Sequence, residues 1–263
     1  MGTAPDVRVP LGPGSRNSWA VSSDTVDLVR AGPPPVPLPV PALPQRLVLD
    51  LRRCALIVID MQRDFCSADG WLASIGVDVS AAARPVPVIA ELAAALREND
   101  VPIVWVNWGT RPDRANLPPG VLHVYRPTGV ETGIGDPLAA TGAPVLQAGS
   151  SSAELVDGLV AEPGDIRLDK HRMSGFWDTA LDSILRNLRV DTLLFAGVNA
   201  DQCVLSTLTD AACLGYDVVM VEDACATTSP PFCWEATVYN VRQCFGFTLL
   251  AADVVAALGE RHP

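Results

Sequence analysis

The chain has 263 residues, of which 49% are hydrophobic and 19% are charged, so it is long and apolar enough to form one sizeable core. Its 19 basic and 30 acidic residues give a net charge of −11, which repels phosphate backbones and anionic membrane surfaces. These values exclude a mainly disordered chain and argue against nucleic-acid binding.

The hydrophobic pattern indicates neither a membrane span nor a secretion signal. The longest apolar runs, residues 101–106 and 193–198, are far shorter than the roughly 20 residues of a membrane helix. The first residues contain no basic stretch followed by an apolar one, so we expect a cytoplasmic protein without a membrane partner.

Residues 1–48 differ in composition from the rest of the chain. Ten of the 23 prolines lie within the first 44 residues, and residues 33–44 alternate proline with apolar residues, which predicts polyproline II structure. We therefore expect a proline-rich N-terminal arm over residues 1–48, followed by one domain over residues 49–263. The arm is either a floppy tail or a strap that buries Val36, Leu38 and Val40 against its own body or a neighbouring subunit.

From residue 54 onward, short apolar runs alternate with stretches of helical periodicity, which is typical of β-α units around a parallel sheet. The α/β pattern predicts three α/β/α layers and a central, mostly parallel six-stranded sheet of Rossmann-like type. In chain order, strands are predicted at residues 55–59, 102–107, 165–168, 192–198, 217–221 and 247–250, and helices at residues 87–98, 181–187, 202–214, 234–242 and 253–258. Residues 111–149, rich in Gly, Pro and Thr, are predicted to form a long functional loop.

Three polar residues stand at predicted strand ends, where open α/β sheets bind their ligands. Asp60 ends the first strand, Lys170 follows the third, and Cys203 begins the helix after the fourth. A cysteine in the first turn of a helix has its pKa lowered by the helix dipole, and a nearby lysine would stabilise its thiolate. An aspartate would take the thiol proton and later return it to a leaving amine.

The remaining cysteines and histidines form no metal-binding pattern. The seven cysteines include no C-x-x-C pair, and the three histidines are scattered, so we expect reduced thiols. Neither a G-x-G-x-x-G motif nor a Walker-type phosphate loop follows the first strand, which argues against a nucleotide-binding module, and we expect no cofactor.

Four motifs resemble the isochorismatase-like cysteine hydrolases: ALIVIDMQRDF at residues 55–65, DKHRMSGF at 169–176, GVNADQCV at 197–204 and VEDA at 221–224. The resemblance implies an isochorismatase-like fold and a catalytic triad of Asp60, Lys170 and Cys203. It also implies a cis Val198–Asn199 peptide bond, an oxyanion hole formed by the Asn199 and Cys203 N–H groups, and a homo-oligomer, either a dimer or a tetramer.

Differences between this sequence and some members of the family limit the reactions that we expect it to catalyse. The cysteine at 203 favours hydrolysis of a C–N bond over vinyl-ether cleavage, through a thioester intermediate. No histidine lies between Asp60 and His123, where metal-dependent nicotinamidases have theirs, so we expect no metal. The sequence looks most like the ureidoacrylate and biuret hydrolases, and its substrate is expected to be a small molecule.

Two alternatives remain open. A streptothricin hydrolase, which opens a lactam of a cationic antibiotic, fits the charge of −11, and a catalytically silent scaffold on the same fold is the rival outside enzymology. The substrate-binding candidates adjoin the triad in sequence, although Gln62 and Asn107 are also typical loop caps, and Trp177 is expected in the core. These candidates are Gln62, Phe65, Asn107, Trp108 and Phe176.

Overall fold

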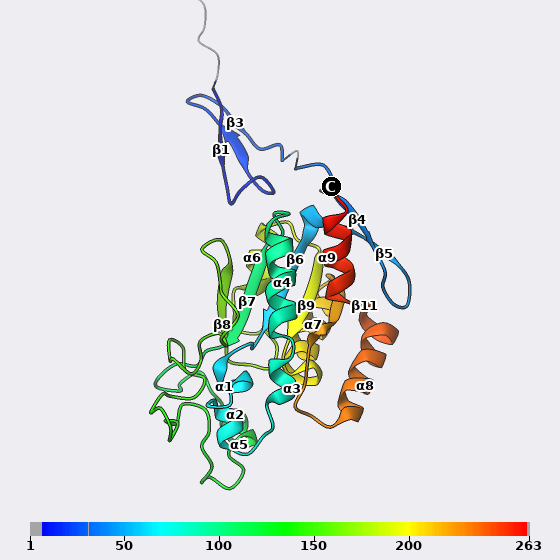
Figure 1. Cartoon of the computed structure of the whole chain (residues 1–263). Coiled ribbons are helices and arrows are strands. Elements are labelled where there is room, and N and C mark those ends of the chain that lie inside the picture. The colour runs from blue at the N-terminus through cyan, green and yellow to red at the C-terminus, as the bar shows by residue number, and fades with distance from the viewer. Residues whose placement is uncertain (1–6, 31, 262–263) are drawn as a thin grey trace, which may run out of the picture.

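The computed structural model describes residues 7–30 and 32–261 (Figure 1). Six strands form a central sheet in the order β11-β10-β9-β6-β7-β8, and every neighbouring pair is parallel. The strands are β6 (Cys54–Ile59), β7 (Ile103–Trp108), β8 (Ile166–Lys170), β9 (Thr192–Gly197), β10 (Asp217–Cys225) and β11 (Phe247–Leu249).

Helices cover both faces of the sheet. The helices α4 (Val86–Arg97) and α9 (Ala251–Gly259) contact each other over one face (Figure 1). On the other face, Gly175 fits between Val106 of β7, Leu181 of α6 (Leu181–Asn187) and Thr207 of α7 (Leu205–Cys213). Every residue of β6 is buried, as expected for a parallel strand between two helical layers. The predicted three-layer α/β fold is therefore confirmed.

Several elements differ from their predicted bounds for local reasons. The helix predicted at residues 202–214 is divided into a π-helical turn, η2 (Ala200–Val204), and α7. A second π turn, η3 (Val241–Phe245), continues α8 (Pro231–Asn240). A π turn adds one residue to a helical turn, and hydrophobic periodicity does not reveal such an insertion.

Short helices were not predicted, because one or two turns are too short to establish a period. They are η1 (Leu51–Arg53), α1 (Arg63–Cys66), α2 (Trp71–Ser74), α3 (Ser80–Ala83) and α5 (Pro119–Val124), and α5 is the one helix within the long loop at residues 111–149.

The N-terminal segment has its own secondary structure. The strands β1 (Val9–Leu11), β2 (Trp19–Val21) and β3 (Val26–Asp27) form a small antiparallel sheet. Next, β4 (Pro37–Val40) pairs with β5 (Leu47–Asp50), so the polyproline II prediction is wrong at residues 37–40. Leu38 and Val40 join the core while the two prolines of β4 stay exposed, and this hairpin packs on its own body as a strap.

Two predictions from composition can be compared with these elements. All seven cysteines are unpaired thiols, as expected. Within residues 7–30 and 32–261, each helix is too short or too polar to traverse a bilayer.

Candidate active site

The carboxyl ends of three strands bring Asp60, Lys170 and Cys203 into contact. Asp60 follows β6 in a left-handed backbone conformation, with φ of 52°, which turns the chain away from the sheet. The Nζ atom of Lys170, the last residue of β8, lies 2.8 Å from Asp60 Oδ2 and 3.4 Å from Cys203 Sγ. All three residues are buried, at 1%, 0% and 4% exposure respectively.

The lysine side chain crosses the end of β7 to reach its partners, because β7 lies between β6 and β8 in the sheet. Its Nζ lies 4.3 Å from the centre of the Trp108 ring, a cation–π contact between two buried side chains. Lys170 is also the only lysine in the sequence, since the other 18 basic residues are arginines.

Burial controls the protonation of the cysteine. It raises the pKa of the Cys203 thiol, and the negative charge of Asp60 raises it further, while the Lys170 charge lowers it. The prediction of a lowered thiol pKa is therefore wrong, because the loss of solvation exceeds the effect of the helix start. Burial therefore favours the neutral form of the Cys203 thiol, which donates to Met173 Sδ at 3.7 Å and accepts from Lys170 Nζ at 3.4 Å.

The pair of Asp60 and Lys170 supplies the charges around this thiol. Burial raises the pKa of the Asp60 carboxyl, and the nearby Lys170 charge offsets part of that effect. Burial lowers the pKa of Lys170, but its interactions with the Asp60 carboxylate and the Cys203 sulfur together outweigh burial, so the net pKa is raised. Lys170 therefore remains a cation, and Asp60 is an acceptor whose affinity for protons is increased.

The segment between β9 and η2 contains the expected cis bond, at Val198–Asn199. Gly197 has a φ of 118°, and a Cβ atom at this position would lie 2.0 Å from the Ile59 carbonyl oxygen, so only glycine fits. Among the described residues, the backbone N–H of Asn199 has no hydrogen-bond acceptor. This N–H is therefore a free donor four residues before Cys203.

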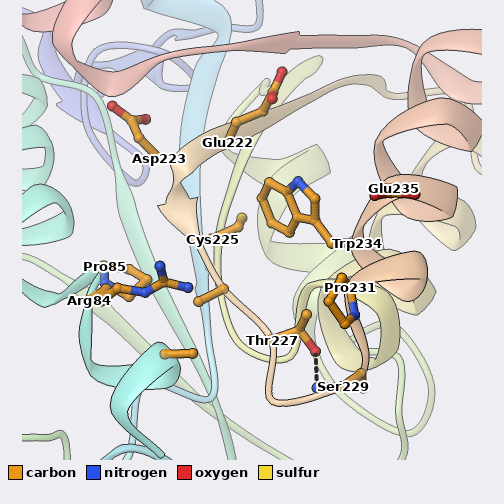
Figure 2. A pocket seen from close by; sticks show the side chains of 12 residues that line it. Arg84, Pro85, Glu222, Asp223, Cys225, Thr227, Ser229, Pro231, Trp234 and Glu235 are labelled. Carbon is orange, nitrogen blue, oxygen red and sulfur yellow. Dashed lines mark hydrogen bonds between the residues drawn. The ribbon is translucent and has the colours of Figure 1, made fainter.

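The loop after β10 holds the segment between β9 and η2 in place through hydrogen bonds. Ala226 accepts a hydrogen bond from Ala200 N at 2.8 Å, and Thr228 N donates to Asn199 Oδ1 at 3.1 Å. This loop is one wall of a cavity of about 650 Å³, in which Arg84 and Trp234 lie on opposite sides of Cys225 (Figure 2). The cavity also contains three carboxylates, those of Glu222, Asp223 and Glu235.

The side-chain amide of Gln62 is both a hydrogen-bond donor and a hydrogen-bond acceptor to the protein backbone. Its Nε2 donates to the carbonyl oxygens of Trp108 at 2.8 Å and Ala153 at 2.6 Å, and its Oε1 accepts from Trp108 N at 2.8 Å. The side chain is fully buried. Gln62 therefore fixes the backbone of Trp108, whose ring covers Lys170, and joins this strand end to the loop at Ala153.

An Isochorismatase domain model matches residues 54–253, which span the whole central sheet and the triad residues. The chain belongs to the isochorismatase family. It is 36% identical over 222 residues to a ureidoacrylate amidohydrolase RutB from Enterobacter sp. (strain 638), an alignment that covers 83% of this chain and 95% of that protein.

Two solved structures also resemble this isochorismatase-family chain. An isochorismatase family protein from Desulfovibrio vulgaris subsp. vulgaris str. Hildenborough has a TM-score of 0.63 and 30% identity, covering 79% of this chain and 99% of that one. An N-carbamoylsarcosine amidase from Thermoplasma acidophilum has a TM-score of 0.57 and 27% identity, covering 76% of this chain and 96% of that one.

In this family member, an aromatic cluster that the sequence did not reveal covers the triad. Tyr125, from the long loop, packs edge-on against Trp71 with ring centres 5.1 Å apart, and its hydroxyl lies 4.0 Å from Met173 Sδ. Met173 Sδ in turn lies 3.7 Å from Cys203 Sγ. In the sequence, the only features that could have pointed to this cluster are an aromatic residue in the long loop, Tyr125, and a methionine three residues after Lys170, Met173. Of the predicted residues, Phe65 joins the cluster through Trp71, at 6.2 Å.

Three other predicted residues lie outside this isochorismatase-family site. Asn107 pairs with Asp169 across β7 and β8 and lines a cavity of about 200 Å³, to which Trp108 and Ala153 also contribute but no triad residue does. Phe176 packs against Tyr216 at 5.9 Å. Trp177 is 63% exposed, so its assignment to the core is wrong, because it lies in a loop after the last buried residue of its motif.

No group of three or more His, Cys, Asp or Glu side chains suited to a metal ion occurs in the described part of this family member. The absence of a metal and of a cofactor in the working enzyme stays a prediction.

A substitution at Gln62 tests its structural role. In Gln62→Glu, the carbonyls of Trp108 and Ala153 lose their donor in a buried site, which would lower the free energy of unfolding by about 2 kcal/mol or more. We expect kcat to fall at least tenfold with little change in KM, because Trp108 moves relative to Lys170. Urea unfolding and steady-state kinetics measure both, with Gln243→Glu, at an exposed glutamine, as the control. A variant with normal stability and a raised KM would instead make Gln62 a substrate contact.

The pH dependence of kcat/KM tests the protonation states. The acid limb should have a midpoint above 3.8, because Asp60 must be ionised to accept the thiol proton and burial raises its pKa. No rise in rate is expected near pH 9, since the thiol transfers its proton to Asp60 and not to water. Circular dichroism over the same range separates titration from unfolding. A midpoint at or below 3.8, or a rate that increases through pH 9, would contradict this assignment.

Proposed function

We propose that this protein is a cysteine-dependent hydrolase that cleaves a C–N bond of a small molecule through a thioester intermediate. The observation that supports it most is the position of Lys170 Nζ, 2.8 Å from Asp60 Oδ2 and 3.4 Å from Cys203 Sγ, where all three side chains are buried. A scaffold has no need to bury a lysine, an aspartate and a thiol together, because unneeded buried charges cost stability.

The first half-reaction transfers the acyl group to sulfur. As Cys203 Sγ attacks the carbonyl carbon, its proton passes to the Asp60 carboxylate, and the oxygen of the tetrahedral intermediate accepts hydrogen bonds from Asn199 N and Cys203 N. The C–N bond then breaks, and the leaving nitrogen takes the proton from Asp60. The products of this step are a free amine and a thioester on Cys203.

The second half-reaction restores the enzyme. A water molecule attacks the thioester carbonyl and gives one proton to Asp60. The C–S bond breaks, and the sulfur takes that proton back, which releases a carboxylic or carbamic acid. Lys170 keeps its proton throughout and neutralises whichever of Asp60 and Cys203 is negative.

A ureido compound is the favoured substrate class. The support is the 36% identity with a protein named ureidoacrylate amidohydrolase and the 27% identity with an N-carbamoylsarcosine amidase, since both names denote ureido substrates. A lactam of a cationic antibiotic is the second candidate, supported by the net charge of −11 and by Asp223 and Glu235 in the cavity next to the Asn199 segment, whose third carboxylate, Glu222, pairs with Arg242. A cytoplasmic location and a homo-oligomeric state remain predictions.

Product analysis separates these candidates. Purified protein is incubated with ureidoacrylate, biuret, N-carbamoyl amino acids, nicotinamide and a streptothricin, and the products are identified by mass spectrometry. A ureido substrate is split into an amine or ammonia and a carbamic acid, which can decompose to carbon dioxide and the second amine, whereas a lactam yields one product that is heavier by one water. If the wild type gives no product with any member of the panel, or if Cys203→Ala gives the same products at the same rate, the hydrolase proposal fails; absence of any product supports the scaffold.

A further inference from the structure

Five arginines surround one cavity at the end of the sheet opposite the candidate active site. The cavity has a volume of about 310 Å³ and lies next to the amino-terminal ends of β6 and β9. Asp50 is the one acidic residue in its described lining. We call this cavity the arginine pocket. Its arginines are Arg16, Arg30, Arg52, Arg53 and Arg189. A chain with a net charge of −11 thus places five of its 18 arginines around one small space.

Two of these arginines have carboxylate partners. Arg52 pairs with Asp100 at 2.9 Å, and Arg53 pairs with Asp191. The Asp50 carboxylate accepts from two backbone N–H groups, at Val36 and Arg52, so much of its hydrogen-bonding capacity is used.

The other three arginines have no carboxylate within ion-pair distance in the described part of the chain. Arg16 donates to main-chain carbonyl oxygens, including that of Asp100 at 2.6 Å, and Arg30 donates to the Asn17 amide at 2.7 Å. Arg189 is exposed; its backbone N–H donates to the Arg186 carbonyl oxygen, and its guanidinium has no hydrogen-bond partner among the described residues. The pocket therefore contains more positive than negative charge.

Crowding of these charges is visible at Arg16. Burial lowers the pKa of its guanidinium, and the neighbouring Arg52 charge lowers it further. Guanidinium groups remain protonated in proteins, so this repulsion does not titrate away, and a bound anion would reduce it.

A second cavity, of about 440 Å³, adjoins the arginine pocket and shares Arg16 and Arg30 with it. Its other walls include Trp19 and Val29. The indole Nε1 of Trp19 is buried without a hydrogen-bond partner in the described structure. The Arg30 guanidinium lies 5.4 Å from the centre of the Trp19 ring, so this aromatic residue, with its unpaired Nε1 donor, adjoins the arginine cluster.

We propose that the arginine pocket binds a phosphate-bearing small molecule, with its phosphate groups among the arginines and its organic part against Trp19. Planar guanidinium forks match the oxygens of a phosphate, and arginines from separate segments surround an anion with two or more negative charges. Arg16 and Arg30 come from the N-terminal segment, whereas Arg53 and Arg189 come from the β6 and β9 side, so the bound anion would join the two parts.

This site is independent of the proposed hydrolase activity. Arg16, Arg30 and Arg52 precede residue 54, where the match to the family model begins. The triad lies at the opposite, carboxyl ends of the strands.

Isothermal titration of the full chain at constant ionic strength tests the proposal with pyrophosphate, ADP and adenosine. We expect pyrophosphate and ADP to bind and adenosine not to bind. Arg189→Gln and Arg30→Gln should each weaken binding at least tenfold, and Cys203→Ala should bind like the wild type. Arg111→Gln, which removes an equal charge from an exposed pair with Asp113, is the matched control and should change the affinity less than twofold.

The outcomes separate the parts of the proposal. Tighter binding of ADP than of pyrophosphate supports the role of Trp19, and equal binding overturns that role alone. If neither pyrophosphate nor ADP binds at 5 mM, or if Arg111→Gln weakens binding as much as Arg189→Gln, the arginine pocket is not a phosphate site.

Discussion

Cys203→Ala should lose turnover by roughly 10⁴-fold or more, because no other group can form the thioester. The fold should survive, since the change removes one buried sulfur and leaves a small cavity, at a cost of about 1 kcal/mol. Mass spectrometry of the products and thermal unfolding measure the two effects.

Cys225→Ala is the matched control for this substitution. Cys225 is also a buried thiol, at 6% exposure, but its Sγ contacts the Phe195 carbonyl and not Lys170. It should keep most of the activity at a similar loss of stability. If Cys203→Ala retains more than a few per cent of the rate, the nucleophile is another residue and the proposed mechanism fails.

Lys170→Met should abolish turnover and also destabilise the protein by about 3–5 kcal/mol. The substitution leaves the Asp60 carboxylate buried without its cation, at a position only 1% exposed. Methionine has a length similar to that of lysine, so the packing against Trp108 is largely preserved.

A double-mutant cycle shows whether this loss comes from the unpaired charge. Adding Asp60→Asn to Lys170→Met should restore most of the free energy of unfolding, measured with urea, while the activity stays absent. Additive losses of stability in the double variant would mean that the pair is not coupled, contrary to the 2.8 Å contact.

The sequence predicted the sheet and the residues that meet at its edge, because both follow from simple rules. The continuous apolar run of β6 identifies a buried parallel strand; Asp60 follows β6 directly, and Lys170 is the last residue of β8. The order of the strands determines which ends are neighbours, and the side chain of Lys170 is long enough to cross the one strand that intervenes.

Other features depend on contacts between distant segments and leave no local pattern. Gln62 bonds to Trp108 and Ala153, which are 46 and 91 residues away, so its role as a clamp is visible only in the fold. Tyr125 reaches the triad from a loop without periodicity, and the π turn at Cys203 differs from an α-helix by a single residue. The raised thiol pKa likewise depends on burial, which a motif does not report.

Because the only lysine is buried, the protein surface carries no lysine ε-amine that can be modified or that loses its charge at high pH. Because Lys170 is 0% exposed, no lysine ε-amine is available to isocyanic acid, reducing sugars or acylating reagents. Carbamylation, which ureido compounds cause when they decompose, would therefore leave the lysine of the folded protein unmodified. The other basic residues are arginines, whose cations persist above pH 12, so the protein loses little positive charge in the range where lysine-rich surfaces become neutral.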